Sequence, residues 1–562
     1  MTVIAPSNTL ISSPLGWFSG LSGWRTIALC AAAGAVATLG HAPFHFAPAF
    51  LVGITLLVWM IDAVPRKRRV SAAFARGWAF GFGHFLSGLY WVSSAFLVDP
   101  DSFGLGLGIA AAVALAAGLA LFWGAGCALV ARFWISDWRR LPLFALGLML
   151  TEIARGHLCG GFPWQLPAYI WEAGGPISQT ASVVGAYGLS GLTLLFAATP
   201  AAVLDGQASA LRRFGPLLVG ALCFGVLWGT GLQRLDSALV ALPGATPVVR
   251  VADPGLSQAE KWQTPADVVL GEYLGISGDP RESRADYVVW PEGAIPAQSY
   301  TLVYGLDGDE NQYALDPTRA AVIAERMGDR VLIAGSTRCA PMAECRAFFE
   351  GARGAEGLRF FNSAVAIDGV SGVARLAGVY DKHRLTPFGE FIPLWNLISG
   401  LNIAPLQRIG AGFTPGPIPQ RLVIDAEAEP VIVQICYESI FPGLIPRGNE
   451  RPGWIVNVTN DAWFGNGSGP LQHFNIARYR AIEEGLPMAR AASGGVSAIV
   501  DAYGRPTRIA AVGVGYAEAQ LPQTLPPTWF ARFGWLLVGA MMLGLLGLRC
   551  IPLERVRRGD EQ

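Results

Sequence analysis

The strongest constraint on this chain is a succession of long apolar runs. Seven of them lie in the first 233 residues and an eighth lies near the carboxyl end, at residues 24–40, 46–64, 72–97, 104–131, 140–156, 178–204, 214–233 and 528–549. A membrane helix needs about 20 mostly apolar residues. Only 15% of the 562 residues are charged, whereas soluble domains have about 25%. We therefore expect an α-helical membrane bundle of eight transmembrane helices.

The loops between these runs alternate between basic and uncharged, and this alternation predicts the orientation. The second run is followed by Arg66-Lys67-Arg68-Arg69, and the loops after the fourth, sixth and eighth runs are also rich in arginine. The alternate loops, 41–47, 99–103 and 156–176, contain no Lys or Arg. Because basic loops stay in the cytoplasm, both termini are expected there. The long segment after the seventh run is then expected in the periplasm of a bacterial cell, outside a multi-pass inner membrane domain.

Residues 241–525 read as a globular domain, because their charges are scattered and β-rich runs alternate with helical stretches. Several runs are continuously apolar, which is typical of strands buried on both faces, and the alternation predicts an α/β layered fold. Strands are expected at 248–253, 286–292, 330–337, 362–368, 430–438, 453–461 and 497–504. The chain would then divide into a membrane domain (1–240), an outer domain (241–525), and a last helix with its tail (526–562).

Three reactive side chains lie at strand ends or in a rigid loop of this outer domain. Glu292 follows the run VVWP, Cys436 follows VIVQI, and Lys382 lies in the Pro- and Gly-rich stretch YDKHRLTPFGEFIP. Singly, each has an ordinary alternative: an exposed carboxylate, a solvated basic turn and an inert buried thiol. Together, a carboxylate can remove the thiol proton, and a lysine cation can stabilise the thiolate and a tetrahedral oxyanion. The set predicts acyl transfer through a thioester.

This combination resembles the nitrilase superfamily, whose Glu-Lys-Cys triad lies on an α-β-β-α sandwich. Further motifs accompany the triad: GFPW (161–164), KW (261–262), WPEGAIP (290–296), YDKHRLTPFGEFIP (380–393), ICYE (435–438), and NDAWFG followed by GPLQH (460–473). With these motifs, and with membrane runs on both sides of the triad, nearly the whole chain is similar to the apolipoprotein N-acyltransferases. The resemblance implies a carbon-nitrogen hydrolase fold for the outer domain.

The resemblance also implies a role for each matching residue. Glu292 would be the general base, Lys382 the stabiliser of thiolate and oxyanion, and Cys436 the nucleophile. Further matches near the active site are Glu390, Glu438, Tyr437 and Trp262. For the two aromatic residues, core or interface packing is the alternative.

Other residues of these motifs are expected to be structural. His383 follows Lys382, and neighbouring residues on an extended chain point to opposite sides. A loop that shapes the cleft is expected to contain Asn460, Asp461, Trp463 and His473. The sequence departs from the family pattern in two places: the first strand reads VRVADPG where the family has a Gln and an Asn, and Ser493 stands where the family has an Asn.

The implied reaction moves a fatty acyl chain from a phospholipid donor to the amino terminus of an S-diacylglyceryl-cysteine apolipoprotein. It needs no cofactor and no metal, and we expect a monomer. The 41 basic and 41 acidic residues balance, so nothing in the overall charge attracts nucleic acid. One alternative is a membrane-tethered amidase or nitrilase that releases its product to water. Another is a transporter or scaffold, although the apolar runs lack the buried charges usual in transporters.

An uncharged apolar segment, 393–406, follows Glu390 closely. In a loop exposed to water such a segment would be a liability, whereas at a bilayer surface it can enter the lipid. We interpret it as a lid over the catalytic cleft, with Trp395 at the headgroup level, where aromatic rings are enriched. Its other apolar members include Leu397, Ile398 and Leu401.

Cys339 and Cys345 bracket the short stretch CAPMAEC in the outer domain. The alternative is two free thiols. Because the periplasm is oxidising and a small polar loop offers few buried positions for free cysteine, we predict a disulfide between them.

The orientation can be tested with topology reporters. A reporter fused near residue 300 should behave as periplasmic, and one fused after Arg558 as cytoplasmic, because the arginine-rich loops hold the opposite side. Paired alkaline phosphatase and fluorescent protein fusions measure this directly. The reverse pattern would contradict both the orientation and the compartment.

Overall fold

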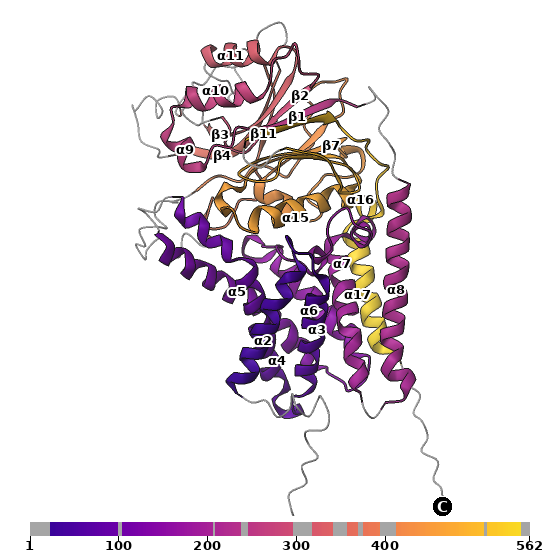
Figure 1. Ribbon diagram of the computed structural model, residues 1–562. Coiled ribbons are helices and arrows are strands. Elements are labelled where there is room, and N and C mark those ends of the chain that lie inside the picture. The colour runs from indigo at the N-terminus through magenta and orange to yellow at the C-terminus, as the bar shows by residue number, and fades with distance from the viewer. Residues whose placement is uncertain are drawn as a thin grey trace, which may run out of the picture.

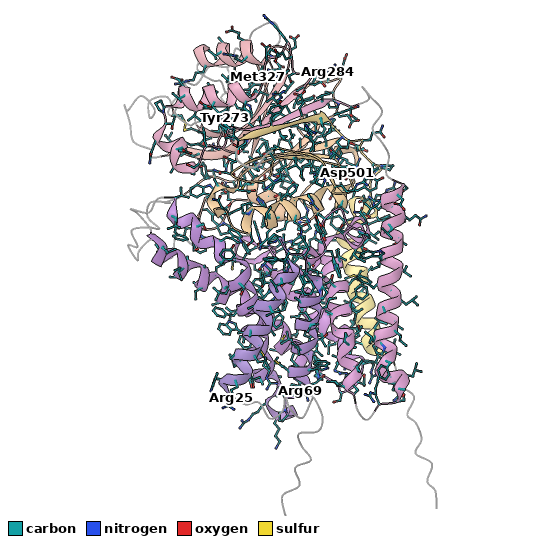
Figure 2. All side chains as sticks on the ribbon, in the orientation of Figure 1. Arg25, Arg69, Tyr273, Arg284, Met327 and Asp501 are labelled. Carbon is teal, nitrogen blue, oxygen red and sulfur yellow. A yellow bond between two sulfur atoms is a disulfide. The ribbon has the colours of Figure 1, made fainter. Side chains whose placement is uncertain are left out.

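The computed structural model describes residues 23–98, 104–205, 208–237, 246–295, 317–340, 345, 357–368, 375–393, 412–510 and 514–551. A bundle of helices forms one half of the molecule, and an α/β domain lies across one end of it (Figure 1). Arg25 and Arg69 lie at the far end of the bundle, while Tyr273, Arg284 and Met327 lie in the α/β domain (Figure 2). The expected lid residues Trp395, Leu397, Ile398 and Leu401 fall outside the described residues.

Each apolar run contains a helix. They are α2 (Trp24–Ala37), α3 (Ala47–Asp62), α4 (Arg69–Gly88), α5 (Gly104–Arg132), α6 (Arg140–Arg155), α7 (Ala181–Ala198), α8 (Ala210–Asp236), and α16 (Trp529–Phe533) with α17 (Trp535–Cys550). Among the described residues, three helical segments are long and apolar enough to cross a membrane: Gly104–Arg132, Ile177–Leu204 and Ala210–Asp236. Shorter apolar helices are Trp24–Gly40, Ala47–Asp62 and Trp535–Cys550. The chain therefore has helices suited to a membrane, whereas their length and apolarity do not establish eight crossings.

Glycine and alanine let the helices of the bundle approach closely. A Cβ atom at Gly34 of α2 would lie 1.9 Å from the carbonyl oxygen of Phe80 in α4, and one at Gly83 would lie 1.9 Å from that of Ala31. Both positions thus require glycine, because the partner in each contact is backbone. Small residues at helix contacts are typical of membrane bundles, where backbone packing replaces the hydrophobic effect.

The α/β domain contains two sheets. The six-stranded sheet has the order β11-β1-β2-β3-β4-β5 and the five-stranded sheet the order β10-β9-β8-β7-β6. The strands are β1 (Val248–Asp253), β2 (Tyr287–Trp290), β3 (Val331–Ala340), β4 (Arg359–Asp368), β5 (Arg375–Asp381), β6 (Val431–Ile435), β7 (Trp454–Asn460), β8 (Met488–Ser493), β9 (Ala498–Val500), β10 (Pro506–Ile509) and β11 (Gly515–Gln520). In each sheet three adjacent strands, β1-β2-β3 and β6-β7-β8, run parallel. Their carboxyl ends therefore meet at one edge of each sheet.

The two sheets face each other and helices cover their outer faces. The core between the sheets joins residues such as Val249, Val289 and Ile333 to Val433, Val456 and Ala491. Helices α10 (Ala266–Ile276) and α11 (Pro317–Met327) pack on the first sheet. Helix α15 (Gly469–Glu484) packs on the second. These layers confirm the predicted α-β-β-α sandwich.

All seven predicted strands are present, with some shifted ends. The run expected as a strand over 430–438 stops at Ile435, because Cys436 turns into a 3₁₀ helix (Cys436–Ile440). Four strands were not predicted: β5, β8, β10 and β11. Strand β8 reads MARAAS, and alanine is a poor indicator of a strand, while β10 is exposed at a sheet edge. The predicted disulfide between Cys339 and Cys345 is confirmed.

Helix α15 joins the two halves of the molecule, because it is buried both by the second sheet and by the helical bundle. Phe474, Ala477 and Ala481 contact the sheet, and Ile476, Tyr479 and Ile482 belong to the core of the bundle. Its polar side chains bond the loop between α6 and α7: Tyr479 Oη donates to the carbonyl oxygens of Ala168 (2.8 Å) and Trp171 (2.7 Å), and Asn475 Oδ1 accepts from Ala173 N (2.9 Å).

The side chain of Gln472 in α15 makes hydrogen bonds to residues of the helical bundle. Its Oε1 accepts from the indole nitrogens of Trp164 (2.9 Å) and Trp91 (3.2 Å), and its Nε2 donates to the carbonyl oxygen of Gly88 (3.2 Å).

Gln472→Ala should lower the free energy of unfolding by about 1–3 kcal/mol, because a buried indole N–H loses its acceptor. Thermal unfolding of the full chain in detergent measures this loss. The exposed Gln263 provides the matched Gln→Ala control, and equal melting points for both variants would contradict the prediction.

Candidate active site

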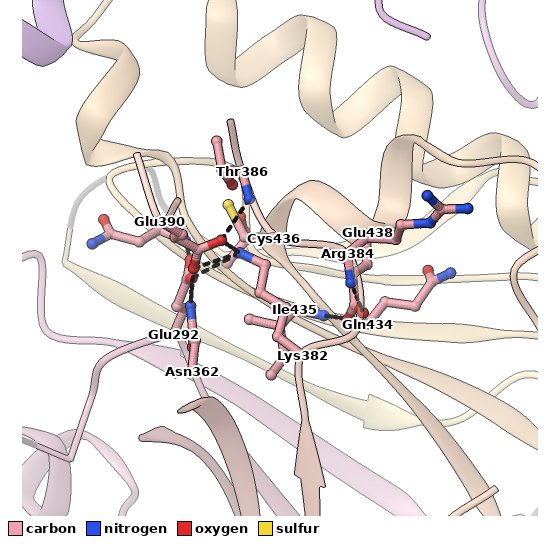
Figure 3. Close-up of polar contacts among 12 residues, drawn as sticks. Glu292, Asn362, Lys382, Arg384, Thr386, Glu390, Gln434, Ile435, Cys436 and Glu438 are labelled. Atoms are coloured by element: carbon pink, nitrogen blue, oxygen red, sulfur yellow. Dashed lines mark hydrogen bonds and ion pairs between the residues drawn. The ribbon is translucent and has the colours of Figure 1, made fainter. Parts of the chain in front are cut away.

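The edge where the parallel strands end brings the predicted triad together. Glu292 follows β2 and Cys436 follows β6, one from each sheet, and Lys382 follows β5 (Figure 3). Ligand sites of α/β sheets lie at the carboxyl ends of the strands. The sequence predicted these three positions from strand ends and loop composition, and only the facing of the two sheets makes them neighbours.

Lys382 is buried between two carboxylates. Its Nζ lies 3.5 Å from Glu292 Oε1 and 2.9 Å from Glu390 Oε2, and the side chain is 1% exposed. Burial alone would lower the pKa of Lys382, but Glu390 and Glu292 raise the pKa above its ordinary value. The lysine is therefore a fixed cation at neutral pH, and a buried cation needs partners of this kind.

Both carboxylates are themselves held in place. Glu292 Oε2 accepts from the backbone N–H of Asn460 (2.9 Å), at the end of β7. Glu390 Oε2 accepts from the backbone N–H of Thr386 (2.8 Å) within the rigid loop. Glu390 thus lies next to the triad, as its place in the resemblance implied.

Asn362 of β4 is a site residue that the sequence did not single out. Its Nδ2 donates to Glu292 Oε1 (2.6 Å) and to Glu390 Oε1 (2.5 Å). Like Lys382, it therefore bridges the two carboxylates. The signal was weak, because an Asn near the start of an apolar strand is unremarkable until the opposing residues are known.

Cys436 lies at a sharp elbow. It follows β6 directly and has φ +49°, in the left-handed region that non-glycine residues rarely adopt. Burial raises the pKa of the Cys436 thiol, and Glu292 raises it further, while Lys382 lowers it. A protonated thiol needs a base before it can act as a nucleophile, and Glu292 is the carboxylate that most strongly affects the pKa of this thiol. A strained strand-to-helix elbow also presents the nucleophile in α/β hydrolases.

Glu438 contacts backbone N–H groups and the Tyr380 hydroxyl rather than the triad. Its Oε1 accepts from Tyr380 Oη (2.8 Å) and from the backbone N–H groups of His383 (2.8 Å) and Arg384 (3.2 Å). Its Oε2 accepts from the backbone N–H of Ile435 (2.8 Å). This buried carboxylate therefore ties the loop of Lys382 to the elbow of Cys436 (Figure 3).

The remaining predicted residues fall into different surroundings. Tyr437 is buried against the helical bundle, and its Oη donates to the carbonyl oxygen of Gly161. Trp262 lies in the short helix α9 (Gln258–Gln263), and its side chain is outside the described part. His383 Nδ1 lies 3.0 Å from the carbonyl oxygen of Gly416, in keeping with a structural role. His473, expected in a loop, lies in helix α15.

The two departures from the family pattern lie beside each other. Asp253, at the end of β1, accepts from the backbone N–H of Gly494 (3.3 Å), the residue after Ser493. Lys261 Nζ donates to Ser493 Oγ (3.0 Å). Burial raises the pKa of Asp253 to about 6 and lowers the pKa of Lys261 to about 8. The two departing stretches therefore share one polar cluster on the Glu292 side of the site. Among the described residues, no group of three or more His, Cys, Asp or Glu is arranged to hold a metal ion.

Comparison with known proteins finds relatives that match nearly the whole chain. The sequence model of the apolipoprotein N-acyltransferase N-terminal domain matches residues 33–199, and the carbon-nitrogen hydrolase model matches residues 249–521. An apolipoprotein N-acyltransferase of Rhodopseudomonas palustris is 36% identical, covering 94% of this chain and 96% of that protein. The chain belongs to the apolipoprotein N-acyltransferase family.

Other members of this acyltransferase family are equally similar. The protein of Caulobacter vibrioides is 37% identical, covering 95% of this chain and 96% of its own. The protein of Brucella melitensis is 35% identical, covering 94% and 95%. The similarity therefore spans both the helical bundle and the α/β domain.

The electrostatics of the site predict how the thiol responds when the cation is removed. Lys382→Met removes the cation that lowers the pKa of Cys436, so the thiolate should form only at higher pH. Each unit of pKa increase lowers the thiolate fraction about tenfold at neutral pH. The rate of alkylation of Cys436 by iodoacetamide, followed by peptide mass spectrometry from about pH 7 to 10, should fall accordingly. The exposed free thiol of Cys159 is the internal reference, and an unchanged ratio of the two rates would contradict the prediction.

Proposed function

We propose that this protein transfers a fatty acyl chain from a phospholipid to the α-amino group of the N-terminal S-diacylglyceryl-cysteine of apolipoproteins. The reaction is a ping-pong acyl transfer through a thioester on Cys436 and is the last step of lipoprotein maturation. The observation that carries the proposal is the buried Glu292–Lys382–Glu390 cluster beside the elbow of Cys436, in a domain packed on a membrane bundle.

In the first half-reaction Glu292 accepts the thiol proton of Cys436, and the sulfur attacks the carbonyl carbon of the donor ester. The Lys382 ammonium stabilises the thiolate and then the tetrahedral oxyanion. When the oxyanion collapses, the carbon–oxygen ester bond breaks, and the lysophospholipid leaves with the proton from Glu292. The acyl chain remains on sulfur as a thioester.

In the second half-reaction the α-amine of the apolipoprotein attacks the thioester carbonyl. Glu292 accepts a proton from the attacking nitrogen, and Lys382 again stabilises the oxyanion. The carbon–sulfur bond then breaks, the amide is released, and the thiol of Cys436 regains the proton from Glu292. Glu390 and Asn362 hold Glu292 and Lys382 in register through both steps.

The packing of the site favours a lipid donor over a water-soluble amide. Tyr437, Ile440 and Phe441, which directly follow the nucleophile, belong to the same apolar core as the helical bundle. The elbow is therefore held at the junction with the membrane domain, where the ester groups of phospholipids are within reach. A membrane-tethered amidase would have no use for this position.

The proposal extends to the domain boundaries and the orientation of the chain in the membrane. The domains are 1–240, 241–525 and 526–562, with eight membrane spans in the bacterial inner membrane, the catalytic domain in the periplasm and the protein a monomer. Arg25 and Arg69 support this orientation, because they lie at the end of the bundle opposite the α/β domain (Figure 2), as expected for the cytoplasmic side.

The test is the covalent intermediate. Purified protein incubated with phospholipid should carry an acyl adduct on Cys436, detected by mass spectrometry of that peptide. Cys436→Ser and Glu292→Gln should form none, because the first lacks a thiolate nucleophile and the second lacks the base. Lys382→Ala should form it more slowly by about 10²–10³.

The second substrate separates the proposal from its rival. Addition of a diacylglyceryl peptide with a free amino terminus should discharge the adduct and yield the N-acyl peptide. Discharge to free fatty acid at the same rate with and without the peptide would identify a hydrolase, and a normal adduct in Cys436→Ser would remove Cys436 from the mechanism.

A further inference from the structure

The conformation of Cys436 needs support, because a left-handed non-glycine residue persists only where its surroundings hold it. Two groups next to Cys436 contact residues outside the elbow. One is the side chain of the following residue, Tyr437. The other is the carbonyl oxygen of Cys436 itself. Both contacts lead to residues 161–164, a part of the connection between α6 and α7 that is called the roof loop here.

Tyr437 provides the first contact. Its hydroxyl donates to the carbonyl oxygen of Gly161, and its ring lies 6.3 Å from the ring of Phe162. The roof loop is in turn fixed in the bundle, because Arg155 of α6 donates to the carbonyl oxygen of Phe162 and pairs with the buried Glu152. Glu152 also accepts from the indole nitrogen of Trp123 in α5 (2.7 Å).

The second contact runs through three fully buried polar side chains, Asp461, His473 and Ser439. His473 Nδ1 lies 2.7 Å from Asp461 Oδ1, and His473 Nε2 lies 2.9 Å from Ser439 Oγ. The spacing is that of a Ser-His-Asp triad, but every member is buried. Instead of facing a substrate, it faces the nucleophile: the carbonyl oxygen of Cys436 lies 3.0 Å from Ser439 Oγ and 3.2 Å from His473 Nε2.

The roof loop covers this trio. The indole of Trp164 stacks on the imidazole of His473, with ring centroids 5.2 Å apart and an interplanar angle of 28°. The indole nitrogen of Trp164 donates to Gln472, the neighbour of His473 on α15. The ring of His473 is thereby fixed between Asp461, Ser439 and Trp164.

We propose that the roof loop of the membrane domain positions the nucleophile, by holding the elbow of Cys436 from one side through Tyr437 and from the other through Trp164 and His473. This inference rests on the proposed role of Cys436. It makes Trp164 and His473 positioning residues that act through the carbonyl group of Cys436 and touch no substrate. The membrane domain then contributes to the chemistry of the site as well as to its location.

The experiment measures acylation of Cys436 by a small soluble ester, p-nitrophenyl butyrate, on the full chain in detergent. The burst of p-nitrophenolate gives the acylation rate, and the mass of the Cys436 peptide identifies the site. Trp164→Ala and His473→Asn should each lower the maximal burst rate by about tenfold to a hundredfold, because small misplacements of a reacting group are costly. The half-saturating ester concentration should stay the same.

The double variant distinguishes positioning from general damage. Because both residues act through one path, Trp164→Ala combined with His473→Asn should be no slower than the slower single variant, whereas independent losses would multiply. Trp164→Phe, which keeps a stacking ring, should retain most of the burst rate. The control is Trp171→Phe: Trp171 follows in the same connection, and its indole nitrogen donates to Thr193 within the bundle (2.9 Å), so its burst should equal that of the wild type.

A wild-type burst in folded Trp164→Ala, or a double variant whose loss is the product of the single losses, would overturn the proposal. If Trp164→Ala does not fold, His473→Asn alone decides, since a wild-type burst in that variant contradicts the second contact. The burst uses neither phospholipid nor apolipoprotein. Failure of the wild type to acylate a diacylglyceryl peptide would therefore count against the proposed function while leaving this comparison valid.

Discussion

The arrangement of the whole molecule depends on the burial of helix α15 on both of its faces. A helix between a sheet and a membrane bundle has no water to satisfy its polar side chains, so each needs a partner in the protein. Gln472, Asn475 and Tyr479 find theirs in the bundle and in the loop between α6 and α7. These bonds fix how the α/β domain lies on the bundle. Because α15 packs on the second sheet, they also fix the position of that sheet's edge relative to the bundle.

The active site follows from where the sheets end. Parallel strands from two facing sheets deliver Glu292 and Cys436 to one edge, and the loop after β5 adds Lys382. A lysine that is 1% exposed is tolerated there because Glu292 and Glu390 compensate its charge. Asn362 and the backbone N–H groups of Asn460 and Thr386 satisfy the remaining carboxylate oxygens. The cluster is thus preorganised, which is what electrostatic stabilisation of an oxyanion requires.

Cys436 is connected to the helical bundle by the same packing. Tyr437, Ile440 and Phe441 belong to the core of the bundle, and the elbow of Cys436 therefore has neighbours from both domains. Cys436 is therefore held at a constant position relative to the helices of the bundle.

The sequence by itself determined the class of the protein, since apolar runs and strand patterns depend on the polarity of consecutive residues. It also singled out Glu292, Lys382 and Cys436 as candidates, because strand ends and rigid loops leave a local signal. It did not reveal that Asn362 bridges two carboxylates, that Glu438 braces backbone, or that His473 lies under the elbow. Those roles were decided only by the tertiary structure, because each is a hydrogen bond between residues distant in the chain, and no local pattern specifies which distant partner a polar side chain will meet.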